Sequence, residues 1–340
     1  MINLISILPS VFELASSDKN REQHLDHIWS LFYNHALLAN ISNGQWIEYI
    51  YSLRLTPSIK EKFLMHTKKL SDLNRIVNIS TEIRRKPQNH KDWTGIALEA
   101  LENQKLEAII GTEEARKMFG IKMENFIDFP IDPFEYKINS LQPVHTSVVP
   151  KNKIGLRDAL KPILQYAKII RIIDPYFNCL AENRGQAYFN ALKLIAELVS
   201  ADSDNYMANR MHRKVIEIFT SKDKSGLPKS HNVLKDKYNE KLLNVATTYG
   251  LKIEMHILRS IPGGTSRPNT RDRPHDRFLL TDQFGFSLSQ GIMFNDESDM
   301  RPVVLHLLTE DSWRVKMEEC TVNPHYETDV SLFVEPSTSE

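Results

Sequence analysis

The sequence predicts an α/β protein in which a helix-rich α/β domain precedes a mixed sheet with flanking helices. Strand-like and helix-like segments alternate after residue 145, a pattern typical of mostly parallel strands joined by helices. Two strand-like segments then flank a tight turn at residues 282–285, which adds an antiparallel hairpin. Before residue 140 the apolar residues recur mainly at helical spacing, so helices are expected to dominate there.

In the N-terminal part, apolar side chains such as Leu25, Ile28 and Leu31 fall on one face of a helix. The segments expected here are helices over residues 25–38, 59–69 and 93–104 and a short strand over residues 106–110. Trp46 and Trp93 are interpreted as core anchors rather than as pocket walls, because large aromatic side chains dominate core burial.

In the C-terminal part, residues 167–173 are dense in β-branched side chains and stop at Asp174 and Pro175, as expected of a buried strand that ends in a turn. Gly250 suits the C-terminal cap of a helix over residues 232–249. The other segments expected are a helix over residues 187–199, a helix from residue 311, and strands over residues 215–220, 251–258, 277–281, 285–289 and 303–308.

The chain has 340 residues, which is too long for one average domain. Prolines gather between residues 128 and 153, and prolines often mark domain boundaries. We therefore expect a helix-rich domain over residues 1–140, whose role the sequence does not indicate, and a second domain over residues 145–330. The last residues are acidic and polar, so residues 331–340 are expected to form a flexible acidic tail.

Composition excludes several classes of protein. Lys and Arg number 43, and Asp and Glu also number 43, so a site for a polyanion must be a local patch. Two cysteines are too few for a disulfide framework or a cysteine-based zinc site, and no metal or cofactor is expected. No apolar run is long enough to span a membrane, and no basic segment precedes the apolar start. A cytoplasmic location is expected.

The most informative segment is a glycine-, proline- and arginine-rich loop. Residues 259–277 hold five arginines, two aspartates and no lysine. Arginine side chains bind phosphate oxygens through paired hydrogen bonds, so this loop suits a phosphorylated ligand. Within it, Arg267, Arg271 and Arg273 are expected to bind backbone phosphates, with an affinity that falls as salt rises.

Three residues at the end of this loop form a candidate catalytic group. His275 and Arg277 are separated by one residue at the start of a predicted strand, so both side chains point to the same face. A histidine can attack phosphorus to form a covalent intermediate, and a neighbouring cation can hold the phosphoryl oxygens. Asp282, at the far end of the strand, is expected to orient the imidazole.

The spacing of His275, Arg277 and Asp282 resembles the phospholipase D superfamily, whose pattern is His-x-Lys-x4-Asp. Ser289, Gly291 and Asn295 fall where the family has small and amide residues, and the resemblance covers residues 145–325. It implies a phospholipase D-like fold, with Ser289 and Asn295 giving supporting hydrogen bonds. The sequence departs from the family in that Arg277 stands where lysine is usual and only one copy of the motif is present. Family members with one copy build the site from two chains, so a homodimer is expected.

The resemblance implies a metal-independent phosphodiesterase, and among these favours a nuclease that acts on the nucleic-acid backbone, with bacterial defence against phage as a context. Asp174, at the end of a strand, either supports this site or caps the turn before Pro175, and the sequence leaves both readings open.

Two alternatives stay open from the sequence. One is a catalytically inactive phospholipase D-like module that binds nucleic acid, phospholipid or a protein partner, since Arg277 replaces the usual lysine. The other is a recognition subunit of a larger complex, with the N-terminal domain or the acidic tail contacting a protein partner. In a purely structural reading, His275 and its arginines only solvate a strand edge.

Overall fold

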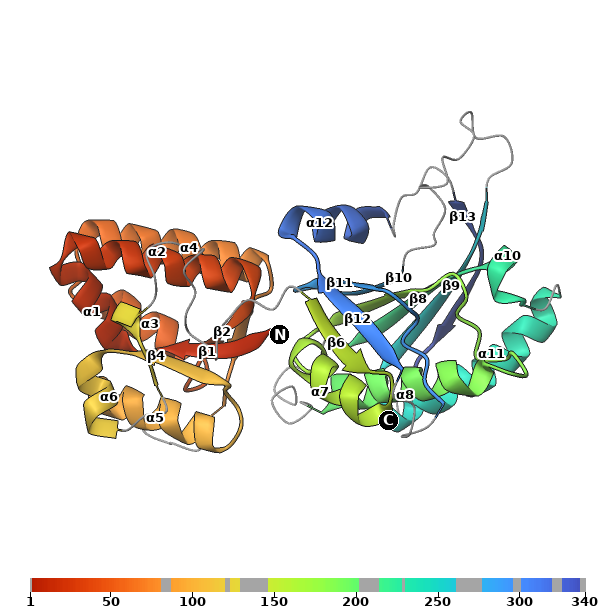
Figure 1. Ribbon diagram of the computed structural model, residues 1–340, viewed down its shortest axis with the longest axis horizontal. Helices are drawn as coiled ribbons and strands as arrows, with labels where there is room; N and C mark the ends of the chain where they lie inside the picture. Colours follow the sequence, from red (N-terminus) through yellow and green to blue (C-terminus); the bar gives the residue numbers. More distant parts are fainter. Residues whose placement is uncertain are drawn as a thin grey trace, which may run out of the picture. The chain divides into compact units, whose positions relative to one another are not determined.

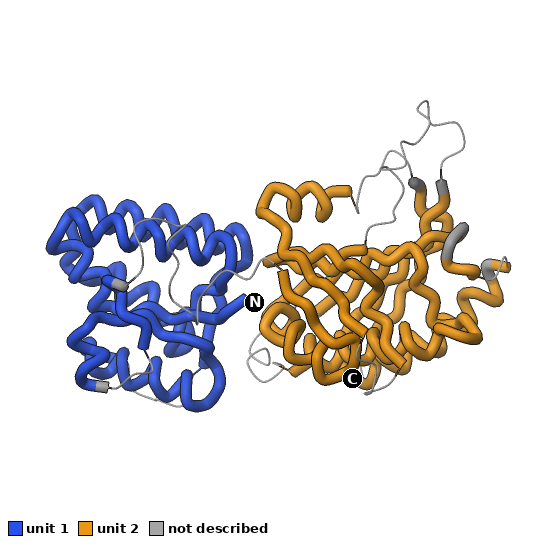
Figure 2. Tube along the Cα trace, viewed as in Figure 1, with its two compact units in different colours: residues 1–144 blue, residues 145–340 orange. Residues whose placement is uncertain are grey.

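The computed structural model describes residues 2–80, 87–119, 123–128, 146–201, 214–227, 230–260, 277–295, 301–319 and 326–336. The protein is an α/β protein, and it divides into two compact units over residues 1–144 and 145–340 (Figure 2). The division falls beside the boundary expected near residue 140. None of the described helices is long and apolar enough to cross a membrane.

Unit 1, residues 1–144, is built on five parallel strands in the order β3-β2-β1-β4-β5 (Figure 1). Its strands are β1 (Asn3–Ile7), β2 (Ala36–Asn40), β3 (Ile76–Asn78), β4 (Ala108–Gly111) and β5 (Glu124–Asn125). Its helices are α1 (Pro9–Ser17), α2 (Lys19–Asn34), α3 (Gln45–Ser52), α4 (Pro57–Asp72), α5 (His90–Glu102), α6 (Glu113–Phe119) and a 3-10 turn, η1 (Phe126–Asp128). The three central strands, β2, β1 and β4, are almost entirely buried, as parallel strands between helices must be.

Aromatic rings fill the core of unit 1. Phe12 packs edge-on against Trp46 and Phe63, with ring centroids 5.8 Å and 5.3 Å apart. The indole of Trp46 donates a hydrogen bond of 2.7 Å to the carbonyl of Ile7, and both Trp46 and Trp93 are fully buried. The interpretation of these two tryptophans as core anchors is therefore confirmed.

Unit 2, residues 145–340, holds an eight-stranded mixed sheet in the order β13-β9-β8-β7-β10-β11-β12-β6. Its strands are β6 (Thr146–Pro150), β7 (Ile169–Ile173), β8 (Val215–Ser221), β9 (Lys252–Ser260), β10 (Arg277–Thr281), β11 (Gly285–Leu288), β12 (Pro302–Leu307) and β13 (Tyr326–Val334). Its helices are α7 (Lys153–Leu164), α8 (Gly185–Ser200), α10 (Lys222–Ser225), α11 (His231–Tyr249) and α12 (Glu310–Glu319). The strands β7, β8 and β9 are parallel, and β10 and β11 form the expected hairpin.

Helices cover the two faces of this sheet unequally. The helices α7, α8 and α11 pack on one face, and α12 lies on the other (Figure 1). Two cations, the buried Lys214 and the largely buried Arg171, attach the helices to the sheet. Lys214 donates to the carbonyls of Gln165 and Val199 at the ends of α7 and α8, and Arg171 of β7 donates to the carbonyl of Met317 in α12. Cations suit helix C-termini because the last carbonyls lack helical partners.

The expected flexible tail over residues 331–340 is wrong in its first four residues. They belong to β13, which pairs with β9 along the edge of the sheet. Within β13 the side chains of Val330, Leu332 and Val334 are buried, while Phe333 is exposed. The overall acidity of this segment concealed a two-residue apolar alternation that is typical of a half-buried strand. Residues 337–340 lie outside the described residues.

A histidine in unit 1 gives a test of this core. His66 stacks on Trp29 with ring centroids 5.0 Å apart, and its Nδ1 is hydrogen-bonded to the hydroxyl of Tyr33. Burial lowers the pKa of His66 from 6.5 to about 4. Between these values the unfolded chain binds a proton that the folded protein does not, so stability falls as the pH drops from 6.5 to 4.

We expect His66→Phe to keep a ring on Trp29 and to remove this contribution to the pH dependence. The measurement is urea unfolding between pH 7.5 and pH 4, followed by tryptophan fluorescence, which reports mainly on unit 1 because Trp313 is the one tryptophan of four outside it. As the pH falls, the free energy of unfolding should decrease less in the variant than in the wild type. A difference that stays constant with pH would contradict a neutral, buried His66.

Candidate functional site

The carboxyl edge of the sheet in unit 1 is closed where parallel α/β sheets usually bind ligands. That place is the gap between β1 and β4, where the strand order reverses. A Cβ added to Gly111 at the end of β4 would lie 3.0 Å from Leu8 and 3.1 Å from the sulfur of Met123. Farther along, the amide of Asn40 bonds that of Asn78 at 2.9 Å. These contacts occupy the carboxyl edge of the sheet at Gly111 and at Asn40.

The site in unit 2 is centred on a buried ion pair. Because β10 runs antiparallel to β7 with Phe278 opposite Ile173, Arg277 comes to lie opposite Asp174, just past the carboxyl end of β7. The Nε of Arg277 donates to Oδ1 of Asp174 at 3.3 Å. The side chain of Asp174 is 2% exposed and that of Arg277 is 24% exposed. The pair therefore has a buried carboxylate end and a solvent-facing guanidinium end.

Within the described part of the chain, the carboxylate of Asp174 accepts hydrogen bonds through one of its two oxygens, Oδ1. Burial raises the pKa of its carboxyl group, while the backbone N–H of Tyr176, which donates at 2.9 Å, and the charge of Arg277 act in the opposite direction. Among the described residues, Oδ2 of Asp174 accepts no hydrogen bond. A buried carboxylate oxygen without a donor costs free energy, so a donor from a further side chain would stabilise Oδ2.

Arg277 is also fixed by an aromatic ring. The ring of Tyr176 lies 5.1 Å from the guanidinium carbon, a cation–π distance. Tyr176 follows Asp174 by two residues, so the same turn supplies both the carboxylate and the ring. The bond to Asp174 uses Nε, and a guanidinium carries N–H donors on two more nitrogens that suit phosphate or carboxylate oxygens. The arrangement can therefore bind an anion.

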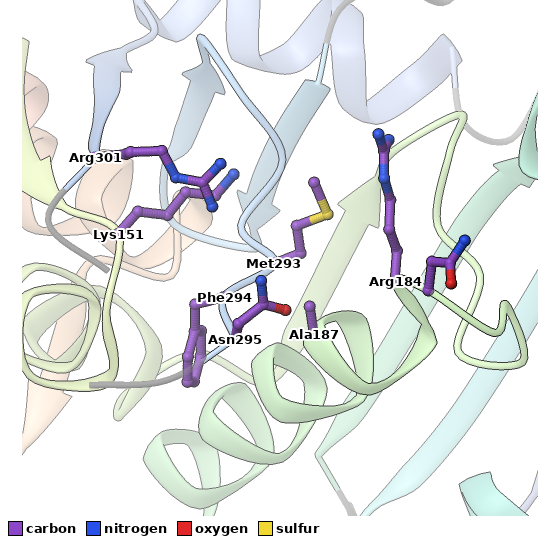
Figure 3. Close-up of a pocket in the computed structure, with 8 residues that line it drawn as sticks. Lys151, Arg184, Ala187, Met293, Phe294, Asn295 and Arg301 are labelled. Carbon is purple, nitrogen blue, oxygen red and sulfur yellow. The ribbon is translucent and has the colours of Figure 1, made fainter. Parts of the chain in front are cut away.

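A cationic hollow of about 170 Å³ lies in the same unit (Figure 3). It is lined by Lys151, Asn183, Arg184, Ala187, Met293, Phe294, Asn295 and Arg301. Three of these residues are cations and none is acidic. The cations come from three separate places in the chain, before α7, α8 and β12, so no local pattern in the sequence could have indicated them.

The site residues predicted from the sequence lie in different parts of the structure. Arg277 and Asp174 are brought together, as described above, and Asn295 lines the hollow. The hydroxyl of Ser289 instead accepts a 2.9 Å bond from the backbone of Val304 and so continues the ladder between β11 and β12. The residues His275, Arg267, Arg271 and Arg273 lie outside the described residues.

Asp282 does not lie beside Arg277. It follows β10 at the opposite end, and its Oδ1 accepts bonds from the backbone N–H groups of Lys168 at 2.9 Å and Ile169 at 3.4 Å. A five-residue strand, about 17 Å long, separates it from Arg277. The geometry gives no support to the expectation that Asp282 orients His275. Its carboxylate instead fixes the start of β7.

Arg259 has a structural role as well. It is one of the five arginines in the loop segment, and it forms ion pairs with Glu327 at 2.7 Å and Asp329 at 3.7 Å, both in β13. This arginine joins two strands at the edge of the sheet. The acidic residues near the C-terminus thus neutralise part of the basic character of residues 259–277.

The comparisons with known proteins leave the family open. No protein-family model matches the chain, and no curated protein sequence gives a significant match. Among solved structures, the chain is similar to that of TrmBL2, an archaeal chromatin protein described as showing a novel mode of DNA binding. The identity is 12%, the match covers 77% of this chain and 80% of that one, and the TM-score is 0.25. A similarity of this size supports no conclusion about function.

Gly291 is expected to be indispensable to the ion pair. A Cβ at this position would lie 2.6 Å from Oδ2 of Asp174, which cannot move away without losing Arg277 or the N–H of Tyr176. We expect Gly291→Ala to lower the free energy of unfolding by about 1–3 kcal/mol. The control is Gly95→Ala in α5, where nothing lies within 4 Å of the added methyl group. It should stabilise the protein by about 1 kcal/mol, because alanine favours helices. Urea unfolding measures both, and equal effects would contradict the crowding at Gly291.

Asp282→Ala is expected to affect stability and not anion binding. Removing the carboxylate leaves the N–H groups of Lys168 and Ile169 without their acceptor, at a cost of about 1–3 kcal/mol. Arg277→Ala should instead reduce the stabilisation that sodium phosphate gives to the folded protein. The measurement is the shift in Tm produced by phosphate in each variant. Loss of that shift in Asp282→Ala would mean that Asp282 belongs to the anion site.

Proposed function

We propose that unit 2 binds and cleaves phosphodiester bonds of nucleic acids without a metal, with His275 as nucleophile and Arg277 as the residue that holds the phosphate. The observation that supports the proposal best is the pair of Asp174 and Arg277, whose carboxylate is buried and whose guanidinium faces solvent. Such a pair positions a cation rigidly at a place where phosphate can reach it. Among the described residues, no group of three His, Cys, Asp or Glu side chains is arranged to hold a metal ion.

The short separation in sequence keeps His275 close to Arg277. His275 precedes Arg277 by two residues, so its Cα can lie no farther than about 7 Å from that of Arg277. In the proposed reaction a ring nitrogen of His275 forms a bond to phosphorus as the bond to the leaving oxygen breaks, and Arg277 neutralises the phosphoryl oxygens. Water then attacks the phosphohistidine and restores the imidazole.

Asp174 takes the orienting role that the sequence gave to Asp282. Its Oδ2 accepts no bond among the described residues and can receive the second ring N–H of a histidine. The leaving oxygen needs a proton, and the motif contains a single histidine. We propose that a second copy of the chain supplies its own His275 as the acid, which makes the active form a homodimer.

The test is cleavage of end-labelled single- and double-stranded DNA and RNA in excess EDTA. We expect the wild type to cleave at least one of these substrates. His275→Ala should lose all activity, and Arg277→Ala should lose about a hundredfold or more, comparable to the loss of one transition-state hydrogen bond. Lys235→Ala, which removes an exposed charge from α11, is the matched control and should keep full activity.

The outcomes separate the alternatives. Equal cleavage by the wild type and His275→Ala would overturn the proposed mechanism. Binding without cleavage, lost in Arg277→Ala, would instead support a module that binds phosphate without turnover. Activity per chain that falls on dilution, in step with dissociation of the dimer, would support the shared site, and a monomer with full activity would exclude it.

A further inference from the structure

The three cations that line the hollow, Lys151, Arg184 and Arg301, suit an anionic ligand. Figure 3 shows the side chains of Lys151 and Arg301 directed into the same space above Asn295, with Arg184 on the other side. Its volume of about 170 Å³ is well above the ~10–15 Å³ that one water needs. The amides of Asn183 and Asn295 add neutral donors to the lining. The three cations suit an anion inside the hollow, and none of the described residues that line it is acidic.

One short segment connects this hollow to the pair of Asp174 and Arg277. Gly291 lies against the carboxylate of Asp174, and Met293, Phe294 and Asn295, which follow at once, form part of the lining. Its neighbour Gln290 accepts a bond of 3.5 Å from Nζ of Lys151. The segment over residues 290–295 therefore touches both places.

The charges confirm that the two places are neighbours. Burial raises the pKa of Asp174, and Lys151 is among the cations that oppose this shift. Burial and the charge of Asp174 raise the pKa of Tyr188 in α8, while Arg277 and Arg184 act in the opposite direction. The pKa of one buried hydroxyl group, that of Tyr188, thus depends on Arg277 of the ion pair and on Arg184 of the hollow.

We propose that the hollow is a second phosphate subsite, which holds the phosphate next to the one bound by Arg277, so that the substrate is an oligonucleotide strand rather than an isolated phosphodiester. The inference rests on the proposed function and specifies its substrate class. Successive phosphates along a strand are a repeated charge at fixed spacing, and two neighbouring cationic sites on one rigid unit suit such a ligand. A ligand with one phosphate can fill only one of the two sites at a time.

The test compares two probes on the full chain. The first is fluorescently labelled oligo(dT) of twelve nucleotides, followed by anisotropy, and the second is the dinucleotide TpT, which carries a single phosphodiester, followed by ³¹P NMR titration. The variant is the double substitution Arg184→Gln and Arg301→Gln, with each single substitution alongside in case the double variant unfolds. Lys235→Ala with Lys237→Ala removes two exposed charges from α11 and is the matched control. Lys151 is left intact because it is 2% exposed.

We expect the double variant to lose about tenfold or more in affinity for the oligonucleotide and to bind TpT as the wild type does. The slope of log affinity against log salt should fall by about 0.7, since about 0.7 is lost for each single-strand phosphate contact and the subsite holds one phosphate. When Arg301 is replaced by lysine instead of glutamine, the protein should keep most of its affinity for the oligonucleotide, because the positive charge is retained.

Three results would overturn the inference. Oligonucleotide binding equal to that of the control pair would mean that the hollow takes no part, while the site at Arg277 would stand. Equal losses for TpT and the oligonucleotide would mean that the hollow and Arg277 form one site. A wild type that binds neither probe would overturn the proposed function itself, and the inference with it.

Discussion

The pairing of β10 with β7 is the constraint on which the arrangement of unit 2 depends. Its antiparallel register places Phe278 opposite Ile173, and the next residues of the two strands, Arg277 and Asp174, therefore meet. Burying a carboxylate to 2% exposure costs several kcal/mol unless a cation and hydrogen bonds compensate. A shift of one residue in this register would turn each side chain of β10 to the opposite face and leave Asp174 without its cation.

The rest of the sheet keeps this register in place. Asp282 fixes the far end of β10 to the start of β7, and the indole of Trp313 in α12 donates to the carbonyl of Thr281. Arg171 joins β7 to α12 on the same face, and Lys214 closes the ends of α7 and α8 on the other. Each of these polar groups is bonded to the backbone and so orients the strands.

Charge is distributed locally although the chain is neutral as a whole. Arg259 is neutralised by Glu327 and Asp329, and Lys222 also pairs with Asp329, at 2.7 Å. Near Asp174, by contrast, the cations Arg184 and Arg301 line a hollow in which no described lining residue is acidic. Equal numbers of basic and acidic side chains over the whole chain, 43 of each, are thus compatible with local groups of cations.

The sequence by itself determined the α/β class, most strands and helices of unit 2, and the choice of Arg277 as a candidate site residue. Periodicity suffices for these because each depends on neighbours a few residues away, as in the β-branched run of β7 or the helical spacing of α2. The sequence pattern did not indicate β13, because the acidity of the last residues of the chain concealed the alternation of its buried apolar residues, such as Val330 and Leu332.

Only the tertiary structure decided which carboxylate pairs with Arg277. Asp282 matches the motif in sequence but lies a strand length away, whereas Asp174, more than a hundred residues from Arg277, is its partner. The same holds for Lys151, Arg184 and Arg301, which gather from three loops. Strand register and loop placement arise from long-range burial and pairing, and no local pattern of residues encodes those distances.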